Sequence, residues 1–408
     1  MLNPFDPQTW PLSLDDLPPG GYLVGGAVRD GLLGRAKASW DLDLVCPTDV
    51  IRLGKRLARQ YRTGFVVLDA DRQIARLIFP GVTVDLSALQ GDDIHSDLRQ
   101  RDFTVNAMAW NYTTRELQDP YHGQADLHWK TLRMVHPENL RQDPLRVLRA
   151  YRLAAQLHFE IEASTQQTLR DCAPYLAQVA PERVQTEISL LLAEGNGPPW
   201  VIRAQEDGVL QPWFPDVQQT WLTLLPRWED VLSLYPPLTP YLTRELRADR
   251  SVIQTLKLRC LLGDDPAAVE QTLTHLRYSR AEIAYLVKLV HLWPRFVVLL
   301  GQSSVPIPDQ FALFQQAGDV LPGLVALALV QGYPVTQVGP WLEHYADPQD
   351  PVAHALPLVT GHDLMQHLGL TPGPHIGELL RALALAHAQG EIRNRQDALA
   401  LAQKLAFP

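Results

Sequence analysis

The signals for β-strands are confined to the first part of the sequence, and this limits the folds that the chain can adopt. Short segments rich in β-branched or alternating apolar residues occur at YLV, DLDLVC, GFVVLD, QIARLIF and TVDLSAL, and a further strand is expected near Ala109. From about Glu138 onward the strand signal fades, and amphipathic helical patterns interrupted by Pro and Gly take over. The sequence therefore predicts an N-terminal α/β head followed by an all-α remainder.

The bulk properties are those of an ordinary folded protein and exclude some classes. Of the 408 residues, 46% are hydrophobic and 20% are charged, which is typical of a chain with several globular domains. Cys46, Cys172 and Cys260 lie far apart, so we expect neither a disulfide framework nor a zinc knuckle. The N-terminus lacks a signal-peptide pattern and no apolar run reaches the length of a membrane span, so we expect a cytoplasmic protein with no membrane partner. The net charge of −9 argues against a general polyanion binder but is compatible with one basic face.

Two glycines stand between the first predicted strand and the first predicted helix. Gly25 and Gly26 lack a Cβ atom, so their backbone N–H groups could approach a phosphate at the start of the helix. Arg29 lies one turn later and could bind the same phosphates. A plain tight turn is the simpler explanation of a lone pair of glycines, so this feature alone does not indicate a phosphate site.

Carboxylates follow at alternate positions of the next strand. Asp41 and Asp43 are two residues apart, so a strand directs both to one face while Leu42 and Leu44 point into the core. Neighbouring carboxylates repel each other unless a divalent cation lies between them, and Mg²⁺ favours one or two carboxylates together with substrate phosphates. Asp85, on a later predicted strand, could supply a third carboxylate. An exposed strand end is the simpler explanation of D-x-D alone, and the upstream glycines favour a metal site.

Two further stretches contain candidate binding residues. In RQRDFTVNAMAW, Arg101 could contact a triphosphate and Asn106 could hydrogen-bond a sugar or a turn, although a routine helix terminus would look the same. In QDPLRVLRAYR, arginines recur every three residues and form a slanting stripe on one helix face, and an aspartate precedes them. An aspartate can accept from the exocyclic amine of C or A, and an arginine can donate to the adjacent acceptor, so such a pair could reject U and G. The residues of this second motif are Asp143, Arg146, Arg149 and Arg152.

Taken together, these motifs resemble the class II tRNA nucleotidyltransferases and the bacterial poly(A) polymerases, which belong to the polymerase-β-like nucleotidyltransferase superfamily. The resemblance rests on GGAVRD, DLDLV, RDFTVNAMA, DPYHG, DPLRVLRAYRLAAQLHF and ERVQTEI, in unbroken order from Gly25 to Leu192, and the segment GHDLMQHLGLTPGPHIGELLRAL resembles the tail of the family. The resemblance implies a polymerase-β-like head with a mixed sheet over residues 1–136. It also implies a helical neck over 137–200, a helical body over 201–345 and a helical tail over 346–408.

The resemblance also implies an activity and a set of site residues. The expected reaction is attack of the tRNA 3′-hydroxyl on the α-phosphate of CTP, with release of pyrophosphate and with Mg²⁺ as cofactor; ATP is a possible substrate. The neck would select the base, and the body and tail would hold the acceptor stem and elbow of tRNA. Asp41 and Asp43 would hold the metal, with Asp85 as a third catalytic carboxylate. The expected nucleotide-binding residues are Gly25, Gly26, Arg29, Arg101, Asp102, Asn106, Asp143, Arg146, Arg149 and Arg152.

The sequence departs from the family pattern at three places. Gln142 stands where the family usually has a glutamate, and Gln100 replaces the first arginine of RRDFT. Only LSALQGDDIHSDLRQ separates Asp85 from Arg101, where complete CCA-adding enzymes carry a basic flexible loop. This short, acidic link resembles the CC-adding enzymes, which leave the terminal A to a separate A-adding enzyme. The alternatives are a CCA-adding enzyme with an unusual loop, an A-adding enzyme or poly(A) polymerase, and a non-catalytic RNA-binding relative.

Overall fold

The computed structural model describes residues 3–35, 40–247 and 250–406. The chain forms two compact units, Met1–Pro212 and Trp213–Pro408, and each is described by itself. The predicted head and neck both lie in the first unit, and the predicted tail lies in the second.

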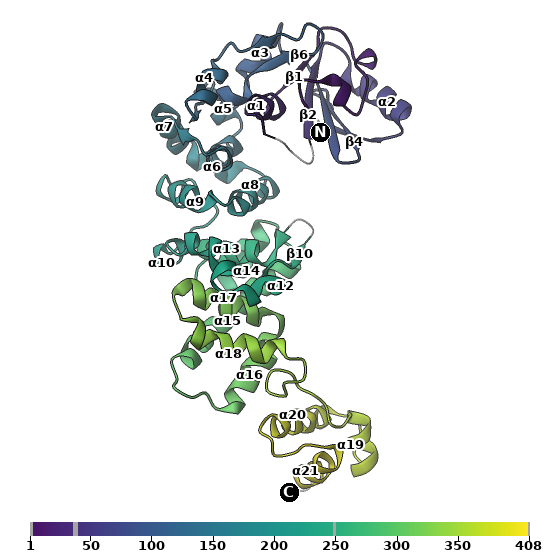
Figure 1. Ribbon diagram of the computed structural model, residues 1–408, viewed down its shortest axis with the longest axis vertical. Helices are drawn as coiled ribbons and strands as arrows, with labels where there is room; N and C mark the ends of the chain where they lie inside the picture. The colour runs from purple at the N-terminus through teal and green to yellow at the C-terminus, as the bar shows by residue number, and fades with distance from the viewer. Residues whose placement is uncertain (1–2, 36–39, 248–249, 407–408) are drawn as a thin grey trace. The chain divides into compact units, whose positions relative to one another are not determined.

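The first unit begins with a mixed β-sheet that has seven strands within the described residues (Figure 1). The strands follow the order β3-β4-β5-β2-β1-β6-β7 across the sheet; β2 and β5 run parallel, and all other neighbours are antiparallel. This arrangement confirms the predicted mixed-sheet head. The strands are β1 Tyr22–Val24, β2 Trp40–Cys46, β3 Gly64–Asp69, β4 Ile74–Phe79, β5 Val82–Ala88, β6 Ala109–Asn111 and β7 Leu117–Gln118.

Alternation along β2 gives the sheet two different faces. Leu42 and Leu44 are buried on one face, where helix α2 (Val50–Tyr61) packs against β3, β4 and β5. The approach of α2 is close: a Cβ atom at Gly54 would lie 2.6 Å from a ring carbon of Phe65. The other face bears Asp41 and Asp43, because successive side chains of a strand point to opposite sides.

Helices cover part of the carboxylate-bearing face and continue into the neck. Helix α3 (Ile94–Arg99) packs there with Val24, Val45 and Ala109 in a small apolar cluster. Further along the chain, α6 packs against α8 and α9 (Figure 1). The remaining helices of this unit are α1 Gly26–Leu32, α4 Gly123–His128, α5 Pro137–Gln142, α6 Leu145–Leu157, α7 Ala163–Cys172, α8 Pro181–Ala193 and α9 Gly197–Glu206.

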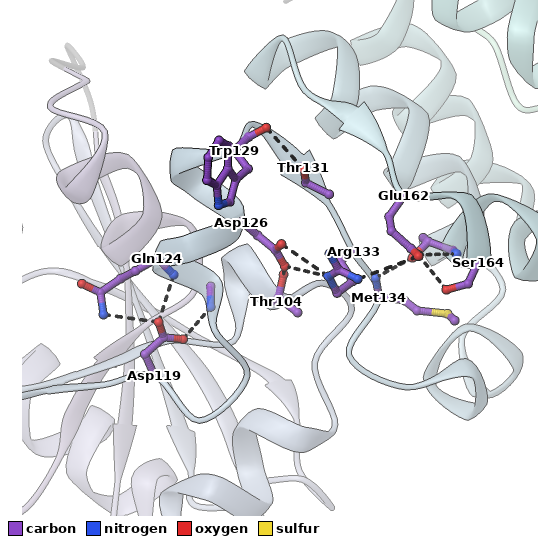
Figure 2. A network of polar contacts seen from close by, with 12 residues as sticks. Thr104, Asp119, Gln124, Asp126, Trp129, Thr131, Arg133, Met134, Glu162 and Ser164 are labelled. Atoms are coloured by element: carbon purple, nitrogen blue, oxygen red, sulfur yellow. Dashed lines mark hydrogen bonds and ion pairs between the residues drawn. The ribbon is translucent and has the colours of Figure 1, made fainter.

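A polar network joins the head to the neck (Figure 2). Arg133 forms ion pairs with Asp126 of α4, at 3.2 Å, and with Glu162, the N-cap of α7, at 3.8 Å. Asp126 also accepts a 2.6 Å hydrogen bond from the hydroxyl of Thr104. Beside this network, β8 (Thr131–Leu132) pairs in parallel with β9 (Glu160–Ile161). The sequence analysis did not predict this small sheet, which interrupts the otherwise helical neck.

The second unit is mainly helical, as predicted. A short hairpin of β10 (Glu245–Arg247) and β11 (Arg250–Ser251) was not predicted. The last three helices share an apolar cluster around Leu364 and Leu383. The helices are α10 Gln219–Leu222, α11 Val231–Leu234, α12 Thr239–Leu242, α13 Val252–Leu258, α14 Pro266–His275, α15 Arg280–Leu300, α16 Ile307–Ala317, α17 Leu321–Gln331, α18 Val335–Ala346, α19 Gly361–Leu368, α20 Pro374–Ala388 and α21 Arg395–Ala406.

Two helical stretches of the second unit have the length and composition of a membrane span, which the search for apolar runs in the sequence did not predict. Arg280–Leu300 and Ile307–Gln331 are long and apolar enough, with mean hydropathies of 1.6 and 1.5 over their most apolar windows. The protein itself buries 50% and 78% of these windows, and a short 3-10 turn that begins at Gly318, with a φ of +52°, divides the second stretch into two helices. Core helices of a folded unit account for their composition.

Glu162 makes the head–neck network sensitive to acid. Partial burial acts to raise the pKa of Glu162, but hydrogen bonds from Ser164 and Thr165 outweigh it and lower that pKa to about 2. A depressed carboxyl pKa stabilises the fold above the unfolded value near 4.5, and this contribution is lost as the pH falls towards 2. We expect Glu162→Gln to destabilise the first unit by about 2 kcal/mol at pH 7 and progressively less below pH 4.5.

Denaturant titrations across this pH range measure the effect. Glu160→Gln, which changes an exposed carboxyl two residues away, is the matched control and should show no such pH dependence. A constant difference between Glu162→Gln and the unsubstituted protein from pH 7 to pH 2.5 would contradict the assignment.

Candidate active site

The candidate site lies on the open face of the sheet, where β2 and β5 run side by side. Asp43 stands directly opposite Asp85, and Asp41 stands opposite Thr83, whose hydroxyl donates a hydrogen bond to Asp41. Asp41 is exposed and Asp43 is half-buried. The structure therefore brings the three predicted catalytic carboxylates to one region of one sheet face.

Asp85 has a cationic partner that the sequence analysis missed. Arg76 of β4 is opposite Asp85 in the antiparallel register, and its Nε and Nη2 atoms donate to the two carboxylate oxygens at 2.7 Å each. This bidentate contact raises the pKa of Arg76 and gives Asp85 a cationic partner. Within the described residues, no group of three or more His, Cys, Asp or Glu side chains could hold a metal ion. A metal site here would therefore rest on Asp41 and Asp43.

The charge on Asp43 is incompletely compensated. Burial raises the pKa of this carboxyl, the nearby Asp85 and Asp41 carboxylates raise it further, and Arg101 and Arg149 lower it only in part, so that it reaches about 6. An excess of negative charge on hard oxygen donors fits a divalent cation such as Mg²⁺. The residues present thus fit the expected cofactor, with two carboxylate ligands.

Gly25 shapes the edge of this site. Its φ of +71° favours glycine, and a Cβ atom there would lie 3.0 Å from Oδ2 of Asp43 and 3.2 Å from Nη1 of Arg101. Arg101 is held in place by Asp97, whose Oδ2 accepts from its Nη2 at 3.1 Å. The absence of a side chain at Gly25 therefore lets a carboxylate and a guanidinium approach the same turn of backbone.

The side chain of Arg29, a predicted phosphate-binding residue, is bound to other side chains inside the protein. Its side chain is only 6% exposed, and it donates to Asp30 at 2.8 Å and to Asn106 at 2.7 Å. Asn106 in turn donates to Oδ1 of Asp102 at 3.0 Å. In this arrangement Arg29 and Asn106 connect α1 to the loop after α3, and a phosphate contact by Arg29 stays a prediction.

The arginine stripe of α6 is bound to neighbouring elements. Arg149 forms an ion pair with Asp102 at 2.8 Å, and Arg152 donates to Glu187 of α8 at 2.6 Å. Burial raises the pKa of Asp102, but the charge of Arg149 and the hydrogen bond from Asn106 outweigh it, so that the pKa lies below its ordinary value. The stripe therefore connects the neck to the head, and a freely solvated face is excluded.

The two residues expected to select the base have different partners. Arg146 donates to the backbone carbonyls of Gln100, at 2.8 Å, and Asn139, at 3.2 Å. Asp143 follows α5 directly and accepts a 2.9 Å hydrogen bond from Arg183 of α8. Arg183 was not predicted as a site residue, although it lies within the ERVQTEI motif. Both side chains are half-buried, and the contact of Arg146 with Gln100 brings it next to the residue that precedes Arg101.

Models of known families match successive parts of the chain. The model of the poly(A) polymerase head domain matches residues 21–92 and 81–133, and that of the "Probable RNA and SrmB- binding site of polymerase A" matches 158–220. The model of tRNA nucleotidyltransferase domain 2 matches residues 251–402.

Relatives of known name match nearly the whole chain. The CC-adding tRNA nucleotidyltransferase of Synechocystis sp. is 38% identical over 98% of this chain and 96% of its own. The CC-adding enzyme of Geobacter sulfurreducens is 32% identical over 93% and 90%, respectively. The A-adding tRNA nucleotidyltransferase of Deinococcus radiodurans is 32% identical over 96% and 97%. The chain belongs to the class II tRNA nucleotidyltransferase and poly(A) polymerase family.

Solved structures of the family share the fold. A CCA-adding enzyme with CTP has a TM-score of 0.74 at 22% identity and covers 95% of this chain and 91% of its own. The Thermotoga maritima CCA-adding enzyme complexed with tRNA has a TM-score of 0.71 at 22% identity, with the same coverage. The expected family and the expected polymerase-β-like head followed by helices are confirmed.

The raised pKa of Asp43 predicts that its charge destabilises the metal-free protein. A carboxyl whose folded pKa lies near 6, above the unfolded value of 3.8, lowers stability as the pH rises from about 4 to 6. We expect Asp43→Asn to raise the free energy of unfolding by about 2 kcal/mol at pH 7.5 without Mg²⁺. The same variant should lose the thermal shift that Mg²⁺ gives the unsubstituted protein.

Asp41→Asn is the matched control, because Asp41 is exposed and belongs to the same pair. It should abolish the Mg²⁺-dependent shift without the gain in metal-free stability. If Asp43→Asn is less stable than the unsubstituted protein at pH 7.5, the electrostatic account of Asp43 is wrong.

Proposed function

We propose that this protein is a template-independent tRNA 3′-end nucleotidyltransferase that adds two cytidines from CTP. The observation that carries this proposal is the incompletely neutralised Asp41–Asp43 pair, next to Gly25 and Arg101, on the open face of a polymerase-β-like head. Family relatives that span almost the whole chain are named for addition of CC. A non-catalytic protein would gain nothing from the charge of Asp43, which opposes folding in the absence of a cation.

Each part of the site has a role in this reaction. Asp41 and Asp43 would hold Mg²⁺, which supplies charge stabilisation for the triphosphate. Arg101, fixed by Asp97, presents a guanidinium to the same region and can bind phosphate oxygens of the nucleotide. The 3′-hydroxyl of tRNA attacks the α-phosphate, the bond to the β-phosphate breaks, and pyrophosphate leaves. Catalysis in such a site is mainly positioning and electrostatic stabilisation.

Asp143 and Arg146 are the proposed selectors of the base. Hydrogen bonds to backbone carbonyls fix the position of the Arg146 side chain, and the contact with Arg183 positions Asp143. A fixed carboxylate can accept from the amine of cytosine, whereas uracil presents a carbonyl at that point. This arrangement would select CTP without a nucleic-acid template.

The short connection after β5 favours CC addition over CCA addition. Only residues 89–93 separate the end of β5 from the start of α3. Complete CCA-adding enzymes carry a longer flexible loop at this place, which is linked to the change from C to A. The A-adding relative from Deinococcus radiodurans keeps A addition as the second candidate function.

The proposed reaction also implies binding partners and a cellular compartment. The helical body and tail would bind the acceptor stem and elbow of tRNA, and a separate A-adding enzyme would complete the 3′ end. The three cysteines are free and buried, which fits the reducing cytoplasm in which tRNA is processed.

The products made from tRNA that lacks its 3′ terminus test the function. Purified protein with Mg²⁺ and CTP should add two nucleotides, ATP alone should add none, and both together should still give two. Denaturing gels at single-nucleotide resolution measure this, with EDTA and Asp43→Ala as controls that should abolish extension. Three added nucleotides with both substrates would establish a CCA-adding enzyme, and a single A added to tRNA ending in CC would establish an A-adding one.

Replacing Asp143 should change the base preference. In Asp143→Asn the amide can donate to the carbonyl of uracil, so we expect the ratio of kcat/KM for CTP over UTP to fall by about tenfold or more. Arg183→Gln is the matched control, because it removes the same ion pair and keeps the carboxylate. An equal loss of discrimination in both variants would mean that the ion pair, and no contact of Asp143 with the base, carries the effect.

A further inference from the structure

A basic surface lies on the outer side of α2, away from the candidate active site. Between Asp49 and Arg62 the chain has five cationic side chains and a single acidic one, in a protein whose net charge is −9. Arg52, Lys55 and Arg59 follow each other at intervals of three and four residues and are exposed. They share one side of the helix, because positions spaced by three and four residues lie one above the other.

Of the five cations on this part of the chain, only Arg56 has an acidic partner among the described residues. Arg56 donates to the backbone carbonyl of Asp16 at 2.6 Å and lies 4.0 Å from its carboxylate, next to Gln60, which also contacts Asp16. Arg52, Lys55, Arg59 and Arg62 form no ion pair in the described part of the chain. The arginines of α6 differ, because each of them is bound to other groups of the protein.

The position of α2 separates this surface from the carboxylates. Leu53, Gly54 and Leu57 are buried, and a Cβ at Gly54 would lie 3.6 Å from a methyl carbon of Leu86. Leu86 follows Asp85 on β5, so α2 covers the face of the sheet opposite to the catalytic residues. An RNA segment held on α2 therefore cannot be the 3′ end that reacts.

We propose that the exposed stripe of Arg52, Lys55 and Arg59, continued by Arg62, is a second contact surface for the phosphate backbone of the tRNA substrate. The partner chemistry follows from the charge: a row of unpaired cations on an acidic protein matches a linear polyanion, and its contacts would be independent of base sequence. Gln60 and Gln73 border the same hollow and can donate to phosphate oxygens. A membrane surface fits poorly, because the apolar side of α2 is already buried against the sheet.

This inference rests on the proposed function for the identity of the RNA and extends it to a surface of the head. The test compares binding of a tRNA transcript lacking its 3′ terminus, without nucleotide, over a series of salt concentrations by fluorescence anisotropy. Each phosphate contact contributes about 0.7 to 0.9 to the slope of log affinity against log salt. Arg52→Gln/Arg59→Gln should therefore lower the magnitude of the slope by about 1.5.

The matched control is Arg115→Asn/Lys130→Asn, which removes two exposed charges of the same unit away from α2. Both positions have a positive φ, which asparagine tolerates. The loss of these two charges should leave the slope unchanged. Equal slopes for all three proteins, or equal losses in the two variants, would overturn the proposal. Thermal unfolding checks the fold of each variant; if the double variant is destabilised, Arg52→Gln and Arg59→Gln are measured singly, with an expected loss of about 0.8 each.

Two other outcomes have separate meanings. If gel filtration shows that the α2 variant changes self-association and leaves RNA binding intact, the surface belongs to contacts between copies of this chain and the proposal is wrong. If Arg52→Gln/Arg59→Gln shows the expected loss of slope but the unsubstituted protein does not extend tRNA with CTP, the proposed function fails while the α2 surface stands.

Discussion

The ion pair between the half-exposed Arg149 and the buried Asp102 is the contact on which the arrangement of the candidate site depends. Asp102 lies in the head and Arg149 on the neck helix α6, so their 2.8 Å contact fixes the helix that presents Arg146 to the loop that presents Arg101. The same carboxylate accepts from Asn106, which accepts from Arg29 of α1. Asp102, Asn106 and Arg29 are buried, so the loss of one partner would leave a polar or charged group unsatisfied in a low dielectric, which is costly.

The site combines one fully compensated set of charges with one that is incompletely compensated. Asp85, Asp102 and Glu187 each have an arginine partner, and these pairs determine where strands and helices lie. Among the described residues Asp43 has no such direct partner, and the structure holds it at a cost in stability that a bound cation would remove. The division separates the residues that hold strands and helices in place from those proposed to meet the substrate.

The sequence predicted well those features that depend on local periodicity. Alternation along β2 placed Asp41 and Asp43 on one face, and the strands, the glycine turn and the first helix followed from patterns a few residues long. The partners of the site residues were missed, because they come from elements that are distant in the chain. Arg76 meets Asp85 through strand register, and Arg183 meets Asp143 through packing of α8 beside the neck, and neither follows from spacing. The parallel pairing of β8 with β9 joins two dipeptides too short to carry a strand signal.

The five-residue link between β5 and α3 has a consequence for how such proteins diversify. Gly91, Asp92 and Asp93 are exposed there, and the link ends at the side-chain cap that Asp93 supplies to α3. An exposed turn between two fixed ends accepts additional residues cheaply, since each doubling of loop length costs only about 0.6 kcal/mol. Residues inserted at this point would emerge beside the catalytic face without disturbing the core beneath it. An insertion at this one surface turn would leave the sheet, its carboxylates and the arginine partner of Asp85 unaltered.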